Sequence, residues 1–222
     1  GLLNLTKTNK DDAATIFTRL YVEGGDKNLP VGYRNGAKYL QLPEDTPYIE
    51  DPAKVSKYGV IEGYVSFDEV YPKYTGTVTI LGSDIYTFYD TGISFDVNDY
   101  LLPGTSAKVT FIDGLLAGYT FEIISFNYAT KAFVIKEIEE PAIEGGVLPN
   151  DDLRPSLLDH YIIHDILMPT SYVEAAEEKL LERGEDYYEL GSDIEFNDKY
   201  QADCDPLYFK RNNIDLSDKL GK

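Results

Sequence analysis

Two histidines four residues apart are the first feature of this sequence that could do chemistry. His160 and His164 stand in the stretch HYIIHD, with Asp165 directly after them, and they are the only histidines of the chain. On a helix, imidazoles at this spacing project from one face and can hold a divalent metal ion. The β-branched residues between them favour a strand instead, where positions four apart also share a face. His160 and His164 are therefore the candidate metal ligands, but because a third ligand is not evident we predict no metal site and no cofactor.

Other motifs that carry chemistry do not have the required spacing. The stretch FDVNDY offers oxygen ligands, but the residues after it do not match a calcium-binding EF-hand loop, so we predict a turn held by Asx side chains. The glycines of GDKNLPVGYRNG match neither nucleotide-binding pattern. Cys204 lies in the acidic stretch ADCDP, where negative charge disfavours its thiolate. We therefore predict no catalytic residue and no enzymatic activity.

The composition narrows the classes of function. Asp and Glu number 39 against 20 Lys and Arg, which gives a formal net charge of -19. This excess repels phosphate, so we expect no stable binding to nucleic acid. Among so many acidic residues, neighbouring carboxylates arise by composition alone and single out no glycosidase pair. The 19 tyrosines, without any tryptophan, suit either protein interfaces or stacking on sugar rings, and the sequence leaves both uses open.

The chain is long enough to bury a hydrophobic core. Its 222 residues, 43% of them hydrophobic, correspond to one large domain or two small ones. A single cysteine allows no internal disulfide, so packing must hold the fold. Nowhere do about 18 apolar residues follow one another, and we expect no membrane insertion. Because the chain begins with Gly, we interpret it as a fragment whose flanking segments are missing.

The elements that must position these residues are mainly strands. The predicted fold class is α+β, predominantly antiparallel β, built from small β modules with one main helix near 171–188. Residues 1–75 form an N-terminal β-rich segment whose short pieces are separated by turns and prolines. Residues 76–140 alternate apolar and polar positions and form a β module, with a hairpin at 119–138 and its turn at 126–130.

The second half of the chain contains the predicted helix. Residues 141–168 combine Pro, Gly and acidic residues and are expected to form a linker and a short strand. Residues 169–222 are expected to hold the helix and then the start of a further β-containing module. Ser171 and Glu174 have capping-box spacing. An apolar stripe follows at helical spacing, formed by Val173, Ala176, Leu180 and Tyr187. Gly184 costs about 1 kcal/mol relative to Ala, so we expect the helix to end or bend there.

Several stretches resemble one family of phage proteins. TIFTRLYVEGGDKNLPVGYRNGAKYLQ, followed by PYIED and YGVIEG, is similar to a strand-and-turn segment of phage tail-associated proteins of the prophage endopeptidase-tail type. FYDTGISFDVNDYLLPGTSAKVTFIDGLLAGYTFEIISFNYATKAFVI is similar to a β module further along such proteins. ILMPTSYVEAAEEKLLERGEDYY resembles their M-P-x-S-Y-x-x-A-E helix, and DPLYFKRNNIDLSDKL looks like the start of a following module. The resemblance covers most of the chain and includes no peptidase constellation.

The resemblance implies a structural component of a phage or prophage-derived tail tip, the baseplate hub, which assembles by contacts between β modules. It implies other tail proteins as partners and a homotrimer of the full-length protein. The location would be the virion or prophage tail particle, after synthesis in the bacterial cytoplasm. The alternative is a carbohydrate-binding or surface-adhesion β protein, which the tyrosines and the acidity motivate. A hydrolase would need an acid–base or metal site that the motifs do not supply.

Overall fold

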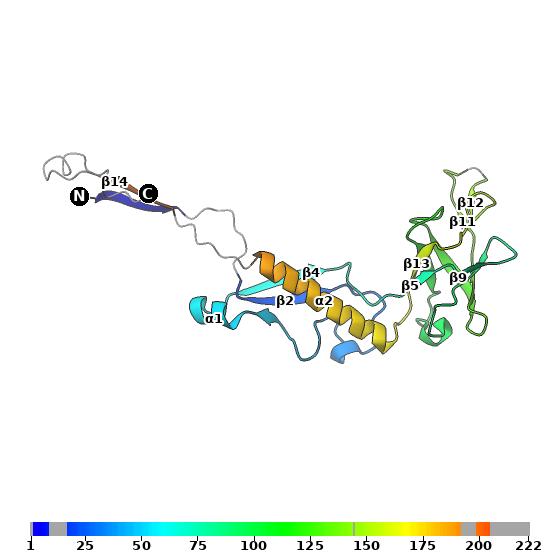
Figure 1. Ribbon diagram of the computed structural model, residues 1–222, viewed down its shortest axis with the longest axis horizontal. Coiled ribbons are helices and arrows are strands. Elements are labelled where there is room, and N and C mark those ends of the chain that lie inside the picture. Colours follow the sequence, from blue (N-terminus) through cyan, green and yellow to red (C-terminus); the bar gives the residue numbers. More distant parts are fainter. Residues whose placement is uncertain (1, 9–16, 144, 192–198, 205–222) are drawn as a thin grey trace.

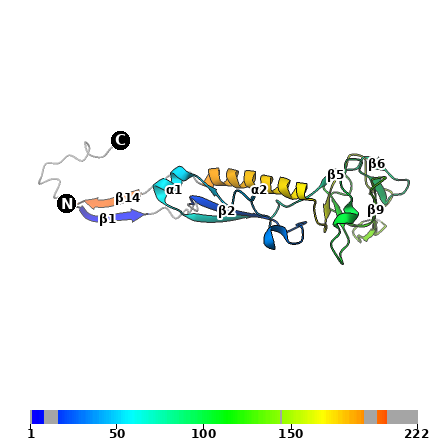
Figure 2. The same cartoon turned by 90° about the horizontal axis from the view of Figure 1, so that it is seen from below.

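The molecule is elongated, with a long helix on a small sheet in its middle and a larger curled sheet towards one end (Figure 1, Figure 2). The computed structural model describes residues 2–8, 17–143, 145–191 and 199–204. Within these residues the strands are mostly antiparallel, and they accompany one main helix and one short helix. This confirms the predicted α+β class.

The described part of the chain contains strands, two α-helices and two 3-10 helices. The strands are β1 (Leu2–Thr8), β2 (Arg19–Gly24), β3 (Ile49–Glu50), β4 (Glu62–Phe67), β5 (Thr75–Thr77), β6 (Ile80–Leu81), β7 (Thr87–Tyr89), β8 (Lys108–Phe111), β9 (Thr120–Asn127), β10 (Ala132–Ile135), β11 (Ile138–Glu139), β12 (Val147–Leu148), β13 (His160–His164) and β14 (Lys199–Cys204). The helices are η1 (Tyr33–Asn35), α1 (Pro52–Tyr58), η2 (Val97–Tyr100) and α2 (Thr170–Gly191). The sheets have the orders β5-β13-β8-β9-β10-β7-β6, β3-β2-β4, β1-β14 and β11-β12.

The seven-stranded sheet curls until it closes on itself. Only Val78 and Thr79 separate β5 from β6, the two outermost strands. The Val78 N–H donates to the Asp159 carbonyl beside β13, at 2.9 Å, and the Thr79 N–H donates to the Tyr89 carbonyl on β7, at 2.8 Å. One bent segment therefore pairs first with β13 and then with β7. We call this unit, residues 72–168, the distal barrel.

Aromatic rings fill the distal barrel. The centre consists of five fully buried side chains, Phe88, Phe111, Phe121, Phe133 and Tyr161. The Phe88 and Phe133 rings stack with centroids 5.1 Å apart, and the Tyr161 ring meets Phe88 edge to face at 5.2 Å. Such offset and edge-to-face contacts stabilise the core beyond the burial of apolar area. The barrel is therefore a packed core and not a pore.

One carboxylate is buried beside these rings. Asp90 is 1% exposed, and its Oδ2 accepts hydrogen bonds from the hydroxyls of Tyr74, at 2.7 Å, and Tyr161, at 2.8 Å. The N–H groups of Thr77 and Gly92 donate to the same carboxylate at 3.2 and 2.8 Å. Burial, together with the bond to Asp90, raises the pKa of both tyrosines well above the usual range, so the hydroxyls remain donors. Four donors replace the water that the carboxylate lost.

The three-stranded sheet and α2 form a second unit, which we call the proximal unit. β4 runs parallel to β2, and β3 runs antiparallel to it. Along β2 the burial alternates, so that Leu20 and Val22 are buried and their neighbours are partly exposed. The buried side chains of α2 pack in the same core as those of β2: Val173, Ala176, Leu180 and Tyr188. One face of this sheet is thus covered by α2.

The position of α2 agrees with the prediction, while two details differ. The helix extends over Thr170–Gly191, against the predicted 171–188. Tyr188, 6% exposed, lies in the core in place of the predicted Tyr187, which is 39% exposed. The helix continues through Gly184, so the prediction that it could end at this residue is wrong.

The reason for Gly184 is close packing of the helix on the sheet. A Cβ atom at this position would lie 2.7 Å from Ile49 Cδ1 and 3.0 Å from Val22 Cγ2. These distances are shorter than ordinary van der Waals contacts, so a larger side chain would force the side chains of Ile49 and Val22 to shift. Tertiary packing therefore outweighs the low helix propensity of glycine.

The division of the chain in space differs from the predicted division along the sequence. β13, within the segment 141–168, is the second strand of the barrel and pairs with both β5 and β8. α2, predicted to belong with a following module, contacts β2 and β3 of the N-terminal segment. The distal barrel is formed by the segment of the chain that lies between β4 and α2. Of the further module expected to start within 169–222, only β14 is described, and the rest lies outside the described residues.

Two predicted turns occur in the distal barrel. β9 and β10 form the hairpin expected at 119–138, with Asn127 paired to Ala132. Its turn spans 128–131, slightly later than the predicted 126–130, because β9 continues to Asn127. In FDVNDY, Asp96 accepts the Asn98 N–H at 3.0 Å and begins η2, which confirms the predicted Asx turn.

Candidate functional site

The two histidines share one face of β13, but each has its own partner. The His160 backbone N–H donates to Asp113 Oδ1 at 2.6 Å, and His160 Nδ1 lies 2.6 Å from Asp113 Oδ2. The backbone hydrogen bond, and then the contact with the ring, keeps the pKa of Asp113 below its usual value. The His164 ring lies against the Tyr71 ring, with centroids 6.4 Å apart. Four strand residues span about 13 Å, so the two imidazoles cannot reach one ion. Over the described ranges, no three His, Cys, Asp or Glu side chains are grouped to hold a metal.

The remaining sequence features lie apart from one another. Cys204 is the last residue of β14, and β14 lies at the opposite end of the molecule from β13, the strand that contains both histidines (Figure 1). Asp96 and Asn98 are engaged in the turn that begins η2. As for membranes, none of the helices in the described residues has both the length and the apolar character needed to cross one. These features do not converge on a reactive centre.

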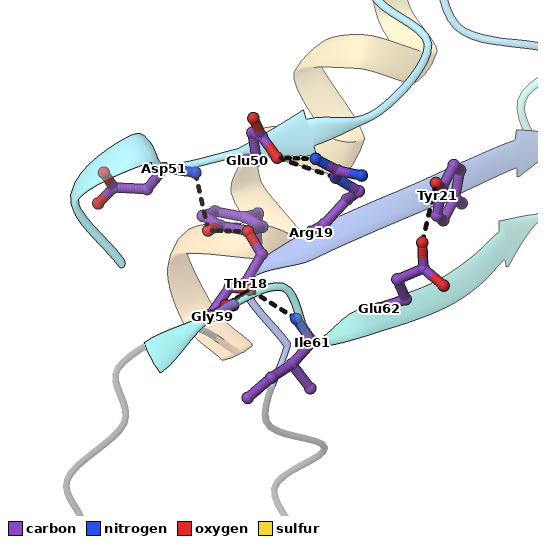
Figure 3. Close-up of polar contacts among 9 residues, drawn as sticks. Thr18, Arg19, Tyr21, Glu50, Asp51, Gly59, Ile61 and Glu62 are labelled. Atoms are coloured by element: carbon purple, nitrogen blue, oxygen red, sulfur yellow. Dashed lines mark hydrogen bonds and ion pairs between the residues drawn. The ribbon is translucent and has the colours of Figure 1, made fainter. Parts of the chain in front are cut away.

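The face of the proximal sheet that is turned away from α2, which we call the open face, carries tyrosines and carboxylates. Tyr21 on β2 lies opposite Tyr64 on β4. The Tyr21 hydroxyl donates to Glu62 Oε1 at 3.1 Å (Figure 3), and the Tyr64 hydroxyl donates to Glu23 Oε2 at 2.6 Å. Each tyrosine thus reaches the neighbouring strand. The hydrogen bond to Glu23 raises the pKa of Tyr64 to about 12, so its hydroxyl remains a donor.

Arg19 orders one end of the open face. Its Nε and Nη2 atoms lie 2.9 and 2.8 Å from Glu50 Oε2 (Figure 3). The guanidinium carbon lies 4.1 Å from the centroid of the Tyr48 ring, a cation–π contact. The Tyr48 ring meets the Tyr21 ring edge to face at 5.9 Å. The rings of the open face are therefore held by polar contacts although they are accessible to solvent.

Three hollows share lining residues with one another, beginning at the open face. The first, about 400 Å³, is lined by Tyr21, Glu23, Arg34, Gln41, Glu44 and Tyr64, among others. The second, about 480 Å³, shares Tyr64 and adds Asp26, Lys27, Tyr39, Ser66 and Asp68. The third, about 550 Å³, shares Asp26 and Lys27. Because neighbouring hollows share lining residues, they form one row, which we call the open-face groove. Each volume lies within the range of roughly 300 to 1,000 Å³ that is usual for ligand sites.

The third hollow lies where the two units meet. The distal barrel contributes Thr110, Thr120, His164 and Asp165 to its lining. Lys108 Nζ lies 2.8 Å from Asp165 Oδ2 at its border. Burial, and secondarily the charge of Lys27, lowers the pKa of His164 below 6.5. The His164 ring is therefore mainly neutral at neutral pH.

Asn28 fixes the junction beside this hollow. Its side-chain Nδ2 donates to the backbone carbonyls of Pro72 and Ile163 at 3.0 and 3.2 Å. Its backbone carbonyl accepts the Met168 N–H at 3.0 Å. Its φ of 60° is left-handed, a conformation that Asn tolerates better than most residues. The Oδ1 atom is buried without a hydrogen-bond partner among the described residues. Asn28 thus ties the loop after β2 to both passages of the chain between the units.

The sequence did not indicate the open-face groove. The alternation of EGYVSF does place Glu62, Tyr64 and Ser66 on one side of a strand. The crossed tyrosine–carboxylate pairs, however, join residues 41 positions apart and depend on the parallel register of β2 and β4. A single sequence contains no signal for that register.

Comparison with known proteins identifies no relative of this chain. No model of a known protein family matches it. Neither a curated protein nor a solved structure matches it.

Proposed function

We propose that this chain is a structural component of a phage or prophage-derived tail tip, within the baseplate hub. The proposal rests first on the resemblance of its sequence to phage tail-associated proteins of the prophage endopeptidase-tail type. Its partners are then other tail proteins and further copies of the full-length chain, arranged as a trimer in the tail particle. Its role is contact and support, without catalysis.

The structural observation that carries the proposal is that the chain enters and leaves the proximal unit at one place. Phe17, just before β2, stacks on Tyr187 near the end of α2, with centroids 5.9 Å apart. The Tyr188 hydroxyl donates to the Thr18 carbonyl at 2.9 Å. β1 and β14, which flank this unit in sequence, pair antiparallel. The distal barrel therefore extends from a single base (Figure 1, Figure 2), as expected for an arm of a larger particle.

The distal barrel has a surface suited to contacts with neighbouring subunits. A set of aliphatic side chains is 42% to 72% exposed, comprising Ile80, Leu81, Ile112, Leu115, Leu157 and Leu158. Their segments lie side by side, since the Ile112 N–H donates to the His160 carbonyl and the Leu158 N–H to the Val78 carbonyl, both at 2.9 Å. Contiguous exposed apolar groups are typical of interaction surfaces. The net charge of -19 keeps such a subunit from adhering to passing DNA.

The proposal is tested on particles from the bacterial strain that encodes the chain. Prophages are induced, tails are purified, and the proteins are identified by mass spectrometry and located by immunogold labelling. We expect the chain in the particles, with label at the tail tip and a trimer after chemical cross-linking. Absence of the chain from intact tails would overturn the proposal.

A further inference from the structure

We propose that the open-face groove binds a neutral oligosaccharide. This site goes beyond the structural role proposed above and does not depend on it. Three properties of the groove carry the inference: rings that are fixed before a ligand arrives, charges that disfavour an anionic ligand, and a position on the face of a sheet.

The rings are fixed by hydrogen bonds at their hydroxyl ends. Tyr64 is 62% exposed, yet its hydroxyl is held on Glu23 at 2.6 Å. Tyr21 is held on Glu62 and touches the Tyr48 ring. A ring that is already ordered loses little conformational entropy when a ligand packs on it. The apolar C–H face of a sugar can cover such a ring while the sugar hydroxyls remain available for hydrogen bonds.

The charges of the groove disfavour an anionic ligand. In the first hollow Glu23 and Glu44 accompany Arg34, and in the second Asp26 and Asp68 accompany Lys27. Arg34 is itself paired with Glu177 at 2.9 Å, so carboxylates are in excess in both hollows and an anionic chain would be repelled. Sugar hydroxyls both donate and accept, so they find partners among the carboxylates, the cations and the neutral side chains of Gln41 and Ser66.

The position of the groove argues against an extended peptide. A peptide that adds a strand binds along the edge of a sheet, through backbone groups. The groove lies instead over the face of the proximal sheet, where β2 and β4 present side chains such as Tyr21 and Tyr64. The third hollow shares Asp26 and Lys27 with the second and adds residues of the barrel, so a ligand of several units could contact more than one hollow.

The first experiment identifies the ligand class. The labelled full chain is applied to an array of neutral, acidic and basic oligosaccharides, and the best-bound hexasaccharide is then titrated by calorimetry. We expect neutral oligosaccharides to be retained and acidic ones to be rejected. Retention of no neutral oligosaccharide, or of charged ones alone, would overturn the inference.

The second experiment locates the site. Tyr64→Ala should weaken binding of that hexasaccharide about tenfold or more, because it removes a whole ring from the groove. Tyr64→Phe keeps the ring and should weaken binding less. Tyr128→Ala is the matched control, since Tyr128 is an exposed tyrosine on the distal barrel, 39% exposed and outside the groove. Circular dichroism verifies that each variant is folded.

Two results would contradict the location. One is an affinity that Tyr64→Ala leaves unchanged, and the other is an equal loss with Tyr128→Ala. Neither result bears on whether the chain is found in purified tail particles, so the sugar-binding proposal and the structural proposal can fail separately.

Discussion

The distal barrel and the proximal unit achieve stability in different ways. The barrel is one continuous stretch whose sheet closes around five aromatic rings and the buried Asp90. The proximal unit joins two segments that are far apart in the sequence, and only one face of its sheet is covered by α2. The comparison shows that a closed sheet has no inner face left for display, whereas the open unit also displays tyrosines and carboxylates to solvent on the face that α2 does not cover.

A second buried carboxylate holds the two segments of the proximal unit together. Glu177 on α2 is 7% exposed and accepts the Tyr33 hydroxyl at 2.7 Å and Arg34 Nη2 at 2.9 Å. Tyr33 and Glu177 are 144 positions apart. Burial, and then the hydrogen bond to Glu177, raises the pKa of Tyr33 to about 12. Asp90 and Glu177 therefore perform comparable structural roles, one within the barrel and one between distant segments.

The largest effect is expected from Asp90→Ala. It leaves the hydroxyls of Tyr74 and Tyr161 and the Thr77 N–H buried without an acceptor, which should lower the free energy of unfolding by about 3–5 kcal/mol. Denaturant unfolding of the full chain measures the loss, and hydrogen exchange locates it. Protection should fall in the barrel and persist in α2. Asp90→Asn, which retains an acceptor, should lose less. An equal loss of protection in α2 would mean that the two units unfold together.

The next largest effect is expected from Glu177→Ala. Removing this carboxylate leaves the Tyr33 hydroxyl without its acceptor and Arg34 without its ion pair, at a cost of about 2–3 kcal/mol. The same hydrogen-exchange measurement should now show the loss in the proximal unit. Glu178→Ala, at the exposed neighbouring position of the helix, should be nearly neutral. Equal effects of the two substitutions would argue against a role of Glu177 in holding the two segments together.

Gly184→Ala should cost about 1–2 kcal/mol, because overpacking against Ile49 and Val22 exceeds the gain in helix propensity. The double variant Gly184→Ala with Ile49→Val removes the Cδ1 atom that the new methyl group meets. The double variant should therefore lose less free energy of unfolding than the two single variants lose together. Strict additivity in denaturant unfolding would indicate that the helix does not approach β3 so closely.

The smallest effect concerns pH at the junction of the two units. The pKa of His164 is lower in the folded chain than its unperturbed value of 6.5, so the unfolded chain takes up a proton first as the pH falls. The contribution of neutral His164 to stability is complete above pH 6.5, the unperturbed pKa, and declines as the pH falls below it. Between about pH 7.5 and 5.5, the unfolding midpoint of His164→Gln should fall less than that of the unaltered chain. Parallel pH profiles would contradict this sign.

The sequence predicted those elements that local periodicity defines. The hairpin at 119–138 and the helix near 171–188 were visible as alternation and as an apolar stripe, and both occur. α1 was missed, although Asp51 accepts the Ala53 N–H at 2.8 Å and Pro52 occupies the first helical position. An Asp–Pro pair of this kind is a recognised start signal for a helix, so that signal was available in the sequence.

The candidate site was not predictable in the same way. Whether Tyr64 meets Glu23 depends on a parallel pairing of strands that are distant in the chain. The role of Gly184 was misjudged because helix propensity describes an isolated helix, whereas the neighbouring atoms belong to β2 and β3. His160 and His164 have the spacing of metal ligands, but their strand conformation separates them.

By itself, the sequence determined the α+β class, the main helix, the principal hairpin and the acidic character of this protein, because periodicity, turn chemistry and charge are local properties. The tertiary structure alone decided that β13 completes the barrel, that α2 returns to the N-terminal sheet, and that three hollows form one groove. These features arise from contacts between residues far apart in the chain, and such contacts leave no periodic pattern in a single sequence.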